Sequence, residues 1–232
     1  MLGALLRSLW ARRGNRRNPL EEYFLRNTGR LIHKWHHYFE IYHRHFAAFR
    51  GRAPVVLEIG VFHGGSLQMW RHYFGPGARI VGVDVDPRCR SFEEPGIEII
   101  IGDQGDRAFL GGLRQRIPRI DILIDDGGHT MAQQIATFDE LYPHVHAEGV
   151  YVCEDVHTSY VAEYGGGYRQ PGTFIEHAKG LVDPLHGWYI TPPGVDAITR
   201  STHSVHFYDS VVVIEKRAMR RPELSKTGTP AF

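Results

Sequence analysis

Cysteine is nearly absent from this chain of 232 residues, and its scarcity excludes a fold held together by disulfides. Only Cys89 and Cys153 occur, at a spacing that fits neither a CxxC redox motif nor a zinc knuckle. No apolar run approaches the roughly 18 residues of a membrane span. The formal net charge of +1 creates no field that would attract nucleic acid or a membrane. We therefore expect a cytoplasmic protein with no transmembrane segment and no nucleic-acid partner.

The rest of the composition is that of an ordinary globular chain, 42% hydrophobic and 23% charged. A chain of this length can bury about 70% of its unfolded surface around one core. Positive charge is concentrated at the start, in MLGALLRSLWARRGNRRN. This stretch lacks the long apolar core and small-residue cleavage site of a secretory leader. We expect a peripheral or partly disordered basic arm, rather than a targeting or membrane-surface helix.

Hydrophobic periodicity changes after about residue 50. In residues 20–50, aromatic and aliphatic side chains recur at spacings of three and four, which predicts two helices broken near residues 27–30. Beyond them, short β-rich apolar runs alternate with helical segments, which predicts a parallel sheet covered on both faces. The apolar runs are residues 55–60, 79–86, 97–103, 120–126 and 149–155, and helical spacing marks residues 64–75 and 130–145.

The sequence therefore predicts an α/β fold with a Rossmann-like doubly wound sheet. Five parallel strands precede a C-terminal antiparallel hairpin in residues 203–217, broken at YDS. We divide the chain into a basic arm and N-terminal helical cap (1–50), an α/β domain (51–219) and a flexible tail (220–232).

Ligands of open α/β sheets bind beyond the carboxyl ends of the strands, and seven acids are expected to meet at that edge. They are Glu58, Asp84, Asp103, Asp125, Asp126, Glu154 and Asp155. So many neighbouring carboxylates need positive partners.

The loop after the first strand favours a ligand with an ammonium group over a dinucleotide. A dinucleotide enzyme would carry GxGxxG here, whereas this chain has Glu58 two residues before Gly60. Gly64, Gly65 and Ser66 then offer free backbone N–H groups at a helix start. An acid in this place suits the methionine part of S-adenosylmethionine.

Acids at the next two strand ends extend the predicted cofactor site. Asp84 can accept hydrogen bonds from both ribose hydroxyls, and Asp103 with Gln104 can bind an adenine edge. Each is weak alone, because a strand-end acid is often a helix N-cap. On successive strands they together predict S-adenosyl-L-methionine as cofactor.

Five segments of the chain resemble the class I S-adenosylmethionine-dependent methyltransferases: VLEIGVFHGGSLQMW, GVDVDP, GDQGD, DILIDDGGHT and YVCEDVHTSYVAEYGGG. Within that class the chain is similar, over about residues 25–217, to the metal-dependent sugar O-methyltransferases. These include the mycinamicin and macrocin, rhamnosyl, and mycobacterial methylmannose polysaccharide types, and the cephalosporin hydroxylase-like group shares the pattern. The resemblance implies that residues 51–219 are a class I methyltransferase domain.

The resemblance also implies a metal site and a general base. In that family the second acid of a DDG(S/G)H motif and both acids of a later ED pair hold Mg²⁺, and the histidine is the base. Carried over to this chain, that implies Asp126, Glu154 and Asp155 as ligands of Mg²⁺ (or Mn²⁺), with His129 as the catalytic base. Asp125 is then left to support the cofactor side or the turn.

A divalent ion suits this reaction because a sugar hydroxyl is a poor nucleophile at neutral pH. Such an ion acts as a Lewis acid toward the hydroxyl, and Mg²⁺ or Mn²⁺ prefers oxygen ligands. A well-placed base contributes about 10²–10⁴-fold. The plainer interpretation makes Asp126 and Asp155 helix N-caps and His129 one unremarkable member of 15 histidines.

Residues 157–168 are rich in tyrosine and glycine, as a mobile acceptor loop would be. Tyr160 and Tyr164 are candidates for substrate contact, although packing over the sheet explains them equally well. His144 and His146 precede the fifth strand and are expected at the opposite edge of the sheet. For residues 33–37 we favour the polar face of an amphipathic helix over a segment that closes on the cofactor.

Together, the motifs and the resemblance predict an S-adenosylmethionine- and Mg²⁺-dependent O-methyltransferase that acts on a sugar hydroxyl. The acceptor would be a small-molecule glycoside or an oligosaccharide, such as a mannoside or a natural-product sugar. One alternative is a catechol-type aromatic O-methyltransferase, and another is a non-catalytic partner protein of the same fold. The aromatic residues of segment 20–50 need burial, which predicts a homo-oligomer such as a dimer.

Overall fold

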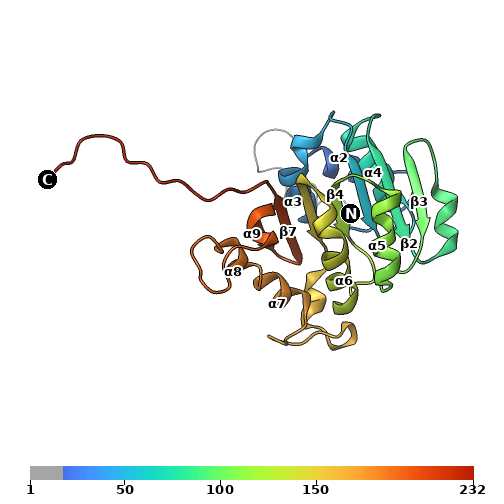
Figure 1. Cartoon of the computed structure of the whole chain (residues 1–232). Helices are drawn as coiled ribbons and strands as arrows, with labels where there is room; N and C mark the ends of the chain where they lie inside the picture. Colours follow the sequence, from blue (N-terminus) through green and yellow to red (C-terminus); the bar gives the residue numbers. More distant parts are fainter. Residues whose placement is uncertain (1–17) are drawn as a thin grey trace, which may run out of the picture.

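A computed structural model describes residues 18–232, so the predicted basic arm lies mostly outside the described residues. Seven strands form one sheet in the order β3-β2-β1-β4-β5-β7-β6, with helices on both faces (Figure 1). The strands are β1 (Val55–Ile59), β2 (Arg79–Asp84), β3 (Ile97–Ile101), β4 (Ile120–Asp125), β5 (Val145–Cys153), β6 (Thr202–Tyr208) and β7 (Val211–Lys216). The α-helices are α2 (Pro19–Arg26), α3 (Tyr38–Phe46), α4 (Gly65–Phe74), α5 (Arg107–Arg116), α6 (Met131–Leu141), α7 (Phe174–Lys179), α8 (Val182–Leu185) and α9 (Ala197–Ser201).

The predicted doubly wound sheet is confirmed. Strands β1 to β5 pair in parallel, and β7 adds antiparallel to β5 with β6 outside it. The predicted hairpin break is the turn between β6 and β7. Strand β5 begins at Val145 rather than at residue 149, because its first residues include the exposed Glu148 and no apolar run marks them.

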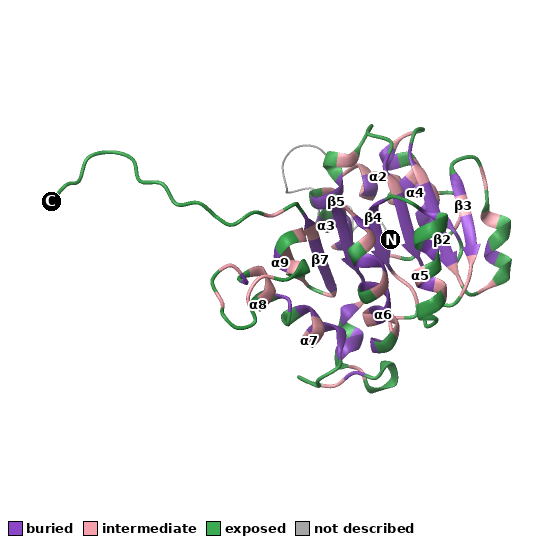
Figure 2. Cartoon of the chain, in the orientation of Figure 1, coloured by how far each residue is buried: buried purple, intermediate pink, exposed green. Residues whose placement is uncertain are grey.

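Alternate residues of the central strands bury two separate faces of the sheet. Val56 and Ile122 point into the core layer shared with α3 and α4, whereas Leu57 and Leu123 point into the layer shared with α5 and α6. Figure 2 shows the central strands buried along most of their length, while most exposed residues lie on the outer helices and loops. Continuous apolar strands are what such a two-sided core requires.

The N-terminal helices are part of the same core as the sheet. Four aromatic side chains of α3, Tyr38, Phe39, Tyr42 and Phe46, are almost completely buried. Tyr42 meets the edge of Trp70 from α4, with 5.0 Å between ring centroids. These four aromatic residues are thus buried within one chain, whereas Trp35 of segment 20–50 is 56% exposed. A homodimer stays a prediction that light scattering can check.

No helix within residues 18–232 is long and apolar enough to cross a membrane. Both cysteines are free and buried. After β7 the chain forms no helix or strand and leads away from the domain (Figure 1).

The loops at the carboxyl edge of the sheet depend on a close backbone approach at Gly60. This residue has φ +95°, and a Cβ there would lie 1.9 Å from the carbonyl oxygen of Asp126. The loop after β1 therefore touches the loop after β4 directly. Gly75 has nearly the same φ, +94°, but an added Cβ would meet nothing within 4 Å.

Alanine substitutions at these two glycines distinguish the cost of steric overlap from the cost of backbone strain. Gly75→Ala should lower the free energy of unfolding by about 1–3 kcal/mol, because its φ of 94° and ψ of 175° form a backbone conformation that is essentially restricted to glycine. Gly60→Ala should cost at least about 2 kcal/mol more, because the methyl group also displaces the Asp126 backbone. Urea denaturation of both variants measures the difference, and equal losses would contradict the close approach.

Candidate active site

The carboxyl ends of the central strands bring predicted site acids together at one edge. In the strand register Ile59 of β1 lies beside Asp125 of β4, which lies beside Cys153 of β5. The next residues, Asp126 and Glu154, are therefore neighbours, and the Glu154 N–H donates to the carbonyl of Asp125 at 2.9 Å. The prediction that these strand ends meet is correct.

The acids after β4 and β5 do not act as helix N-caps. Thr130 caps α6 through a capping box with Gln133, so Asp126 is not needed there. Asp155 precedes the 3₁₀ helix η4 (Val156–Tyr160), but its carboxylate makes no capping hydrogen bond. Both carboxylates are available for other partners.

The first of these partners is a buried ammonium group. Lys34 Nζ donates to Asp126 Oδ2 at 2.5 Å and to Glu154 Oε2 at 2.8 Å. It also lies 3.7 Å from Glu58 Oε1. The side chain of Lys34 is 3% exposed, and those of Glu58 and Glu154 are 0% and 1% exposed. Three carboxylates thus converge on one cation.

The sequence did not predict this contact, because we expected residues 33–37 to face solvent from a helix. That expectation is wrong for Lys34. Helix α2 ends at Arg26 and α3 begins at Tyr38, and the irregular segment between them turns Lys34 inward. Trp35 remains more than half exposed. The sequence did give one indication of such a contact, because the many carboxylates predicted at this edge of the sheet need a cation as partner.

Burial sets the electrostatics of this cluster. It raises the pKa of Glu58 to about 7, against the lowering effect of Lys34. Burial and the charge of Asp126 together raise the pKa of Glu154. Burial alone would lower the pKa of Lys34, but the three carboxylates outweigh it and hold that pKa well above its usual value. One lysine carries less charge than three carboxylates, so this edge of the sheet favours the binding of a further cation.

A second group of ligand atoms lies beside the first. His129 Nε2 is 3.5 Å from Asp155 Oδ2 and 3.9 Å from Asp126 Oδ1. These three residues offer one ligand atom each within 4.8 Å of one another. Both His129 and Asp155 have positive φ, +55° and +51°. Non-glycine residues held in this conformation are typical of functional sites.

The N-terminal segment orients Asp155. Tyr38 donates its hydroxyl to Asp155 Oδ1 at 2.7 Å, and the Trp35 indole N–H donates to the same oxygen at 3.2 Å. The other oxygen, Oδ2, is left facing His129. Asp126 is divided in the same way, with Oδ2 on Lys34 and Oδ1 toward the histidine.

This set of atoms fits a divalent cation. Two carboxylate oxygens and one imidazole nitrogen face a common point, and such donors bind Mg²⁺, Mn²⁺ or a transition metal. Of the three predicted ligands, Asp126 and Asp155 face this point. Glu154 is instead directed at Lys34 through Oε2.

A cleft of about 520 Å³ opens next to the cluster, along the ends of β1, β2 and β3. Asp126 belongs to the cluster and to the cleft, because it also lines the cleft together with Gly127 and Gly128. Phe62 and Val85 line it as well and are largely exposed, at 63% and 67%. Exposed apolar side chains inside a cleft suit a flat aromatic ligand group.

The predicted cofactor residues divide into two groups. Those that line the cleft are Gly60, Asp84, Asp103 and Gln104. Those that are buried beside it are Glu58, Ser66 and Asp125, and Gly64 caps the start of α4. The second group supports the cleft from behind.

Hydrogen bonds show what several of these side chains do. Glu58 accepts from the hydroxyl of Ser66 at 2.8 Å. Gln104 donates to Asp125 at 2.6 Å and to Thr137 at 2.9 Å, so both amide hydrogens are used inside the protein. Burial raises the pKa of Asp125 to about 7. A contact of Gln104 with adenine stays a prediction.

Asp84 holds the loop that forms one wall of the cleft. Its Oδ2 accepts from the backbone N–H groups of Val61 and Phe62 at 2.8 and 3.1 Å, and its Oδ1 accepts from Asp86 at 2.9 Å. Asp103 accepts from Gly105 at 2.7 Å. Each carboxylate therefore fixes backbone while lining the cleft.

The remaining predicted residues lie where the sequence indicated. Tyr160 and Tyr164 are 51% and 37% exposed, in the turns that follow the site acids. Their contact with a substrate stays a prediction. His144 binds the carbonyl of Ile117 at 2.7 Å, and His146 lines a cavity at the opposite edge of the sheet.

Comparisons with known proteins agree with this geometry. The chain is 40% identical over 198 residues to 8-demethyl-8-alpha-L-rhamnosyl tetracenomycin-C 2'-O-methyltransferase of Streptomyces olivaceus, covering 80% of this chain and 52% of that protein. It is 34% identical over 223 residues to mycinamicin VI 2''-O-methyltransferase of Micromonospora griseorubida, covering 88% and 54%. The chain thus spans about half the length of the curated relatives it matches. No family model matches the sequence.

Solved structures of a related methyltransferase are also similar to this chain. The MycE methyltransferase of the mycinamycin pathway, in complex with Mg and SAH, superposes with a TM-score of 0.78 at 34% identity, over 88% of this chain and 56% of that chain. A second MycE structure, which also contains mycinamycin VI, gives 0.77 at 35% identity, over 88% and 55%.

The fold is therefore that of the class I S-adenosylmethionine-dependent methyltransferases. In sequence the chain is similar, over about half of their length, to sugar O-methyltransferases of macrolide and tetracenomycin pathways.

Removing the buried cation should destabilise the protein. Lys34→Met should lower the free energy of unfolding by about 3 kcal/mol in metal-free buffer, because it leaves buried carboxylates without their partner. The matched control is Lys179→Met, which removes an exposed lysine that pairs with Glu176 and should cost less than about 0.5 kcal/mol. Urea denaturation in EDTA compares the two, and equal losses would contradict the role of Lys34.

Proposed function

We propose that this chain is an S-adenosylmethionine- and Mg²⁺-dependent O-methyltransferase that acts on a hydroxyl of a sugar or glycoside. The observation that carries the proposal is the position of Asp126. Its carboxylate belongs to the cation-binding cluster, and the same residue lines the adjoining cleft. A cofactor in that cleft and an acceptor at the cluster would meet at this residue.

The cleft supplies what an adenosyl cofactor needs. Asp84 and Asp103 offer carboxylates to ribose and adenine, and the exposed Phe62 and Val85 offer apolar contact for the base. Gly60 lets the backbone approach closely. S-adenosylmethionine supplies the methyl group. Related proteins support this choice, because MycE crystallised with SAH.

The metal would be held by Asp126 and Asp155, which already face a common point, and by Glu154. A bound Mg²⁺ would act as a Lewis acid toward the acceptor hydroxyl. Glu154 is engaged by Lys34, so its use as a ligand requires that the lysine release it. The MycE structures contain Mg, which supports the choice of ion.

His129 is the proposed general base. Its Nε2 lies 3.5 Å from Asp155 Oδ2 and 3.9 Å from Asp126 Oδ1, so the ring would stand beside an acceptor hydroxyl held at the cluster. Thr158 donates to the His129 carbonyl at 2.9 Å, which helps to fix the strained backbone. As the base, His129 is not counted among the metal ligands, which in this proposal are carboxylates alone.

A sugar hydroxyl is the proposed acceptor because the named relatives methylate sugar positions of glycosylated natural products. Tyr160 and Tyr164, exposed beside the cluster, are the candidate contacts of that acceptor. A catechol acceptor and a non-catalytic partner protein are the competing functions. A cytoplasmic location is part of the same proposal, in keeping with two free cysteines.

The metal requirement can be tested with isosteric variants. Asp126→Asn and Asp155→Asn should reduce methyl transfer at least about 100-fold, and EDTA should do the same to the unmodified chain. Binding of S-adenosylmethionine, measured by calorimetry, should remain within a few-fold for Asp155→Asn. Asp139→Asn, an exposed acid of α6, is the control and should change neither quantity. Full activity in EDTA would refute the role of the metal.

The acceptor is tested by comparing candidate acceptors in parallel assays. Rhamnosides, mannosides and a catechol are each incubated with the chain, labelled S-adenosylmethionine and Mg²⁺, and methylated product is quantified by mass spectrometry. We expect product from a glycoside with a vicinal diol, since two adjacent oxygens can approach the cluster together. A preference for the catechol would replace the sugar assignment. No turnover with any acceptor, despite tight cofactor binding, would favour the non-catalytic partner.

A further inference from the structure

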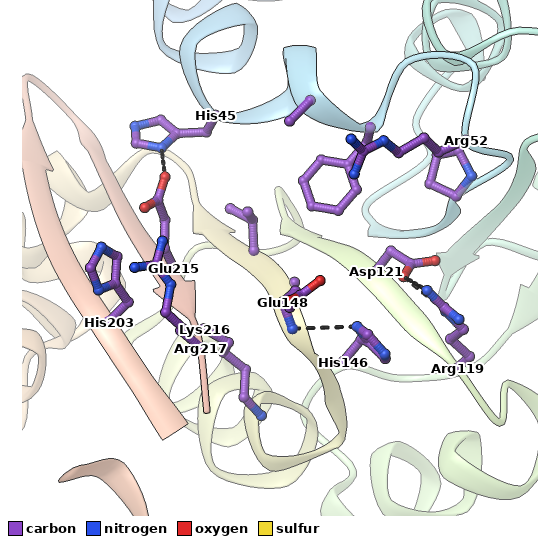
Figure 3. A pocket seen from close by; sticks show the side chains of 15 residues that line it. His45, Arg52, Arg119, Asp121, His146, Glu148, His203, Glu215, Lys216 and Arg217 are labelled. Atoms are coloured by element: carbon purple, nitrogen blue, oxygen red, sulfur yellow. Dashed lines mark hydrogen bonds and ion pairs between the residues drawn. The ribbon is translucent and has the colours of Figure 1, made fainter. Parts of the chain in front are cut away.

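A second cavity lies at the opposite edge of the sheet from the proposed active site. It has a volume of about 320 Å³ and is lined by residues at the beginnings of β4 and β5 and by the end of β7 (Figure 3). The last turn of α3 closes one side of it. Nothing in the proposed methyl transfer uses this cavity or the side chains around it.

Three potential metal ligands from three different elements meet beside this cavity, and two of them, His45 and Glu215, line it. They are His45 of α3, His206 of β6 and Glu215 of β7, and each offers one ligand atom within 4.8 Å of the others. His45 Nδ1 lies 2.7 Å from Glu215 Oε1, and His206 Nε2 lies 3.9 Å from Glu215 Oε2. Figure 3 shows His45 and Glu215 pointing toward each other across the cavity wall.

Tyr208 holds His45 in place, as an outer partner does in metal sites. The Tyr208 hydroxyl lies 2.9 Å from His45 Nε2, the ring nitrogen that does not face Glu215. Ser204 Oγ lies 2.9 Å from His206 Nε2 and donates to Glu215 Oε2 at 3.2 Å, so it contacts the candidate ligand atoms themselves and would be displaced from them by a bound ion. His45 itself is 5% exposed, so its ring cannot turn freely toward solvent.

We propose that His45, His206 and Glu215 form a second metal site, selective for Zn²⁺ over Mg²⁺. Two imidazole nitrogens and one carboxylate oxygen are a common three-ligand set of zinc, whereas Mg²⁺ prefers oxygen ligands alone. In a tetrahedral site with bonds of about 2.0–2.1 Å, ligand atoms lie about 3.3 Å apart, so the present distances require only small side-chain shifts. The fourth position is left to water from the cavity.

Such an ion would join the helical cap to the C-terminal hairpin. Helix α3 carries His45 near its end and Tyr38 at its start, and Tyr38 is the residue that binds Asp155 in the proposed active site. The zinc would therefore hold α3 against β6 and β7 and support the N-terminal side of the active site from a distance. This inference does not depend on the proposed methyl transfer.

The proposal is tested by locating zinc directly. Crystals grown with Zn²⁺ and excess Mg²⁺ should show anomalous scattering at the zinc edge between His45, His206 and Glu215. The active-site cluster also contains a histidine, so position rather than total zinc content decides. Absence of a peak among these three side chains, at zinc concentrations that saturate binding in solution, would overturn the proposal.

Solution measurements give a second readout on matched variants. His206→Gln should remove one zinc equivalent in a chelator competition titration and should abolish the rise of several degrees in Tm that saturating zinc causes in the unmodified chain. Tyr208→Phe should weaken the site about tenfold. His203→Gln, which lines the same cavity without reaching the cluster, should behave like the unmodified chain. Equal zinc content and equal Tm shifts in His206→Gln and the unmodified chain would identify the cluster as a hydrogen-bonded network only.

Discussion

The contact between Lys34 and the buried carboxylates Glu58, Asp126 and Glu154 is the interaction on which the site depends. Parallel strands end at the same edge of a sheet, so acids at or just after the ends of β1, β4 and β5 are forced close together. Burial makes their repulsion costly, and only a cation placed among them makes the arrangement stable. That cation comes from a segment more than 20 residues before the first strand, and docking it brings Trp35 and Tyr38 onto Asp155. The helical cap is therefore electrostatically part of the active-site edge as well as part of the apolar core.

In Asp126 and in Asp155, the two carboxylate oxygens have different partners. Asp126 and Asp155 each present one oxygen to the N-terminal segment and the other toward His129. One set of acids thus anchors the cap and also lies beside the cleft, where we propose that a metal binds. His129 has a positive φ, and the backbones at Gly60 and Asp126 are in close contact, so the loops at this edge are tightly packed. In the proposed function, metal binding and docking of the cap would be coupled, because Glu154 is the hydrogen-bond partner of Lys34 and also a proposed metal ligand.

Much of this could be predicted from the sequence. Continuous apolar runs identified the parallel strands, because only strands buried on both faces carry them, and the edge rule then placed the strand-end acids together. Predictions failed where a residue departs from the usual behaviour of its type. Lysine is almost never buried without a partner, so nothing local marked Lys34 as an interior residue. The sequence also could not show that the amide hydrogens of Gln104 hold Asp125 and Thr137, and a contact of Gln104 with adenine stays a prediction. The short helices between residues 174 and 201 have too few turns for periodicity to show.

Sequence alone determined the class of fold, the edge where ligands bind and the acidic motifs, because periodicity and strand order act through local patterns of residue type. Only the tertiary structure decided which oxygen of each acid faces which partner. Asp126 and Asp155 turn one oxygen toward His129, while Glu154 turns to Lys34. Those choices depend on contacts between residues more than 90 positions apart, such as Lys34 with Asp126. The cluster of His45, His206 and Glu215 has a similar origin, since α3 is distant in sequence from the hairpin of β6 and β7 and contacts it only in the folded chain.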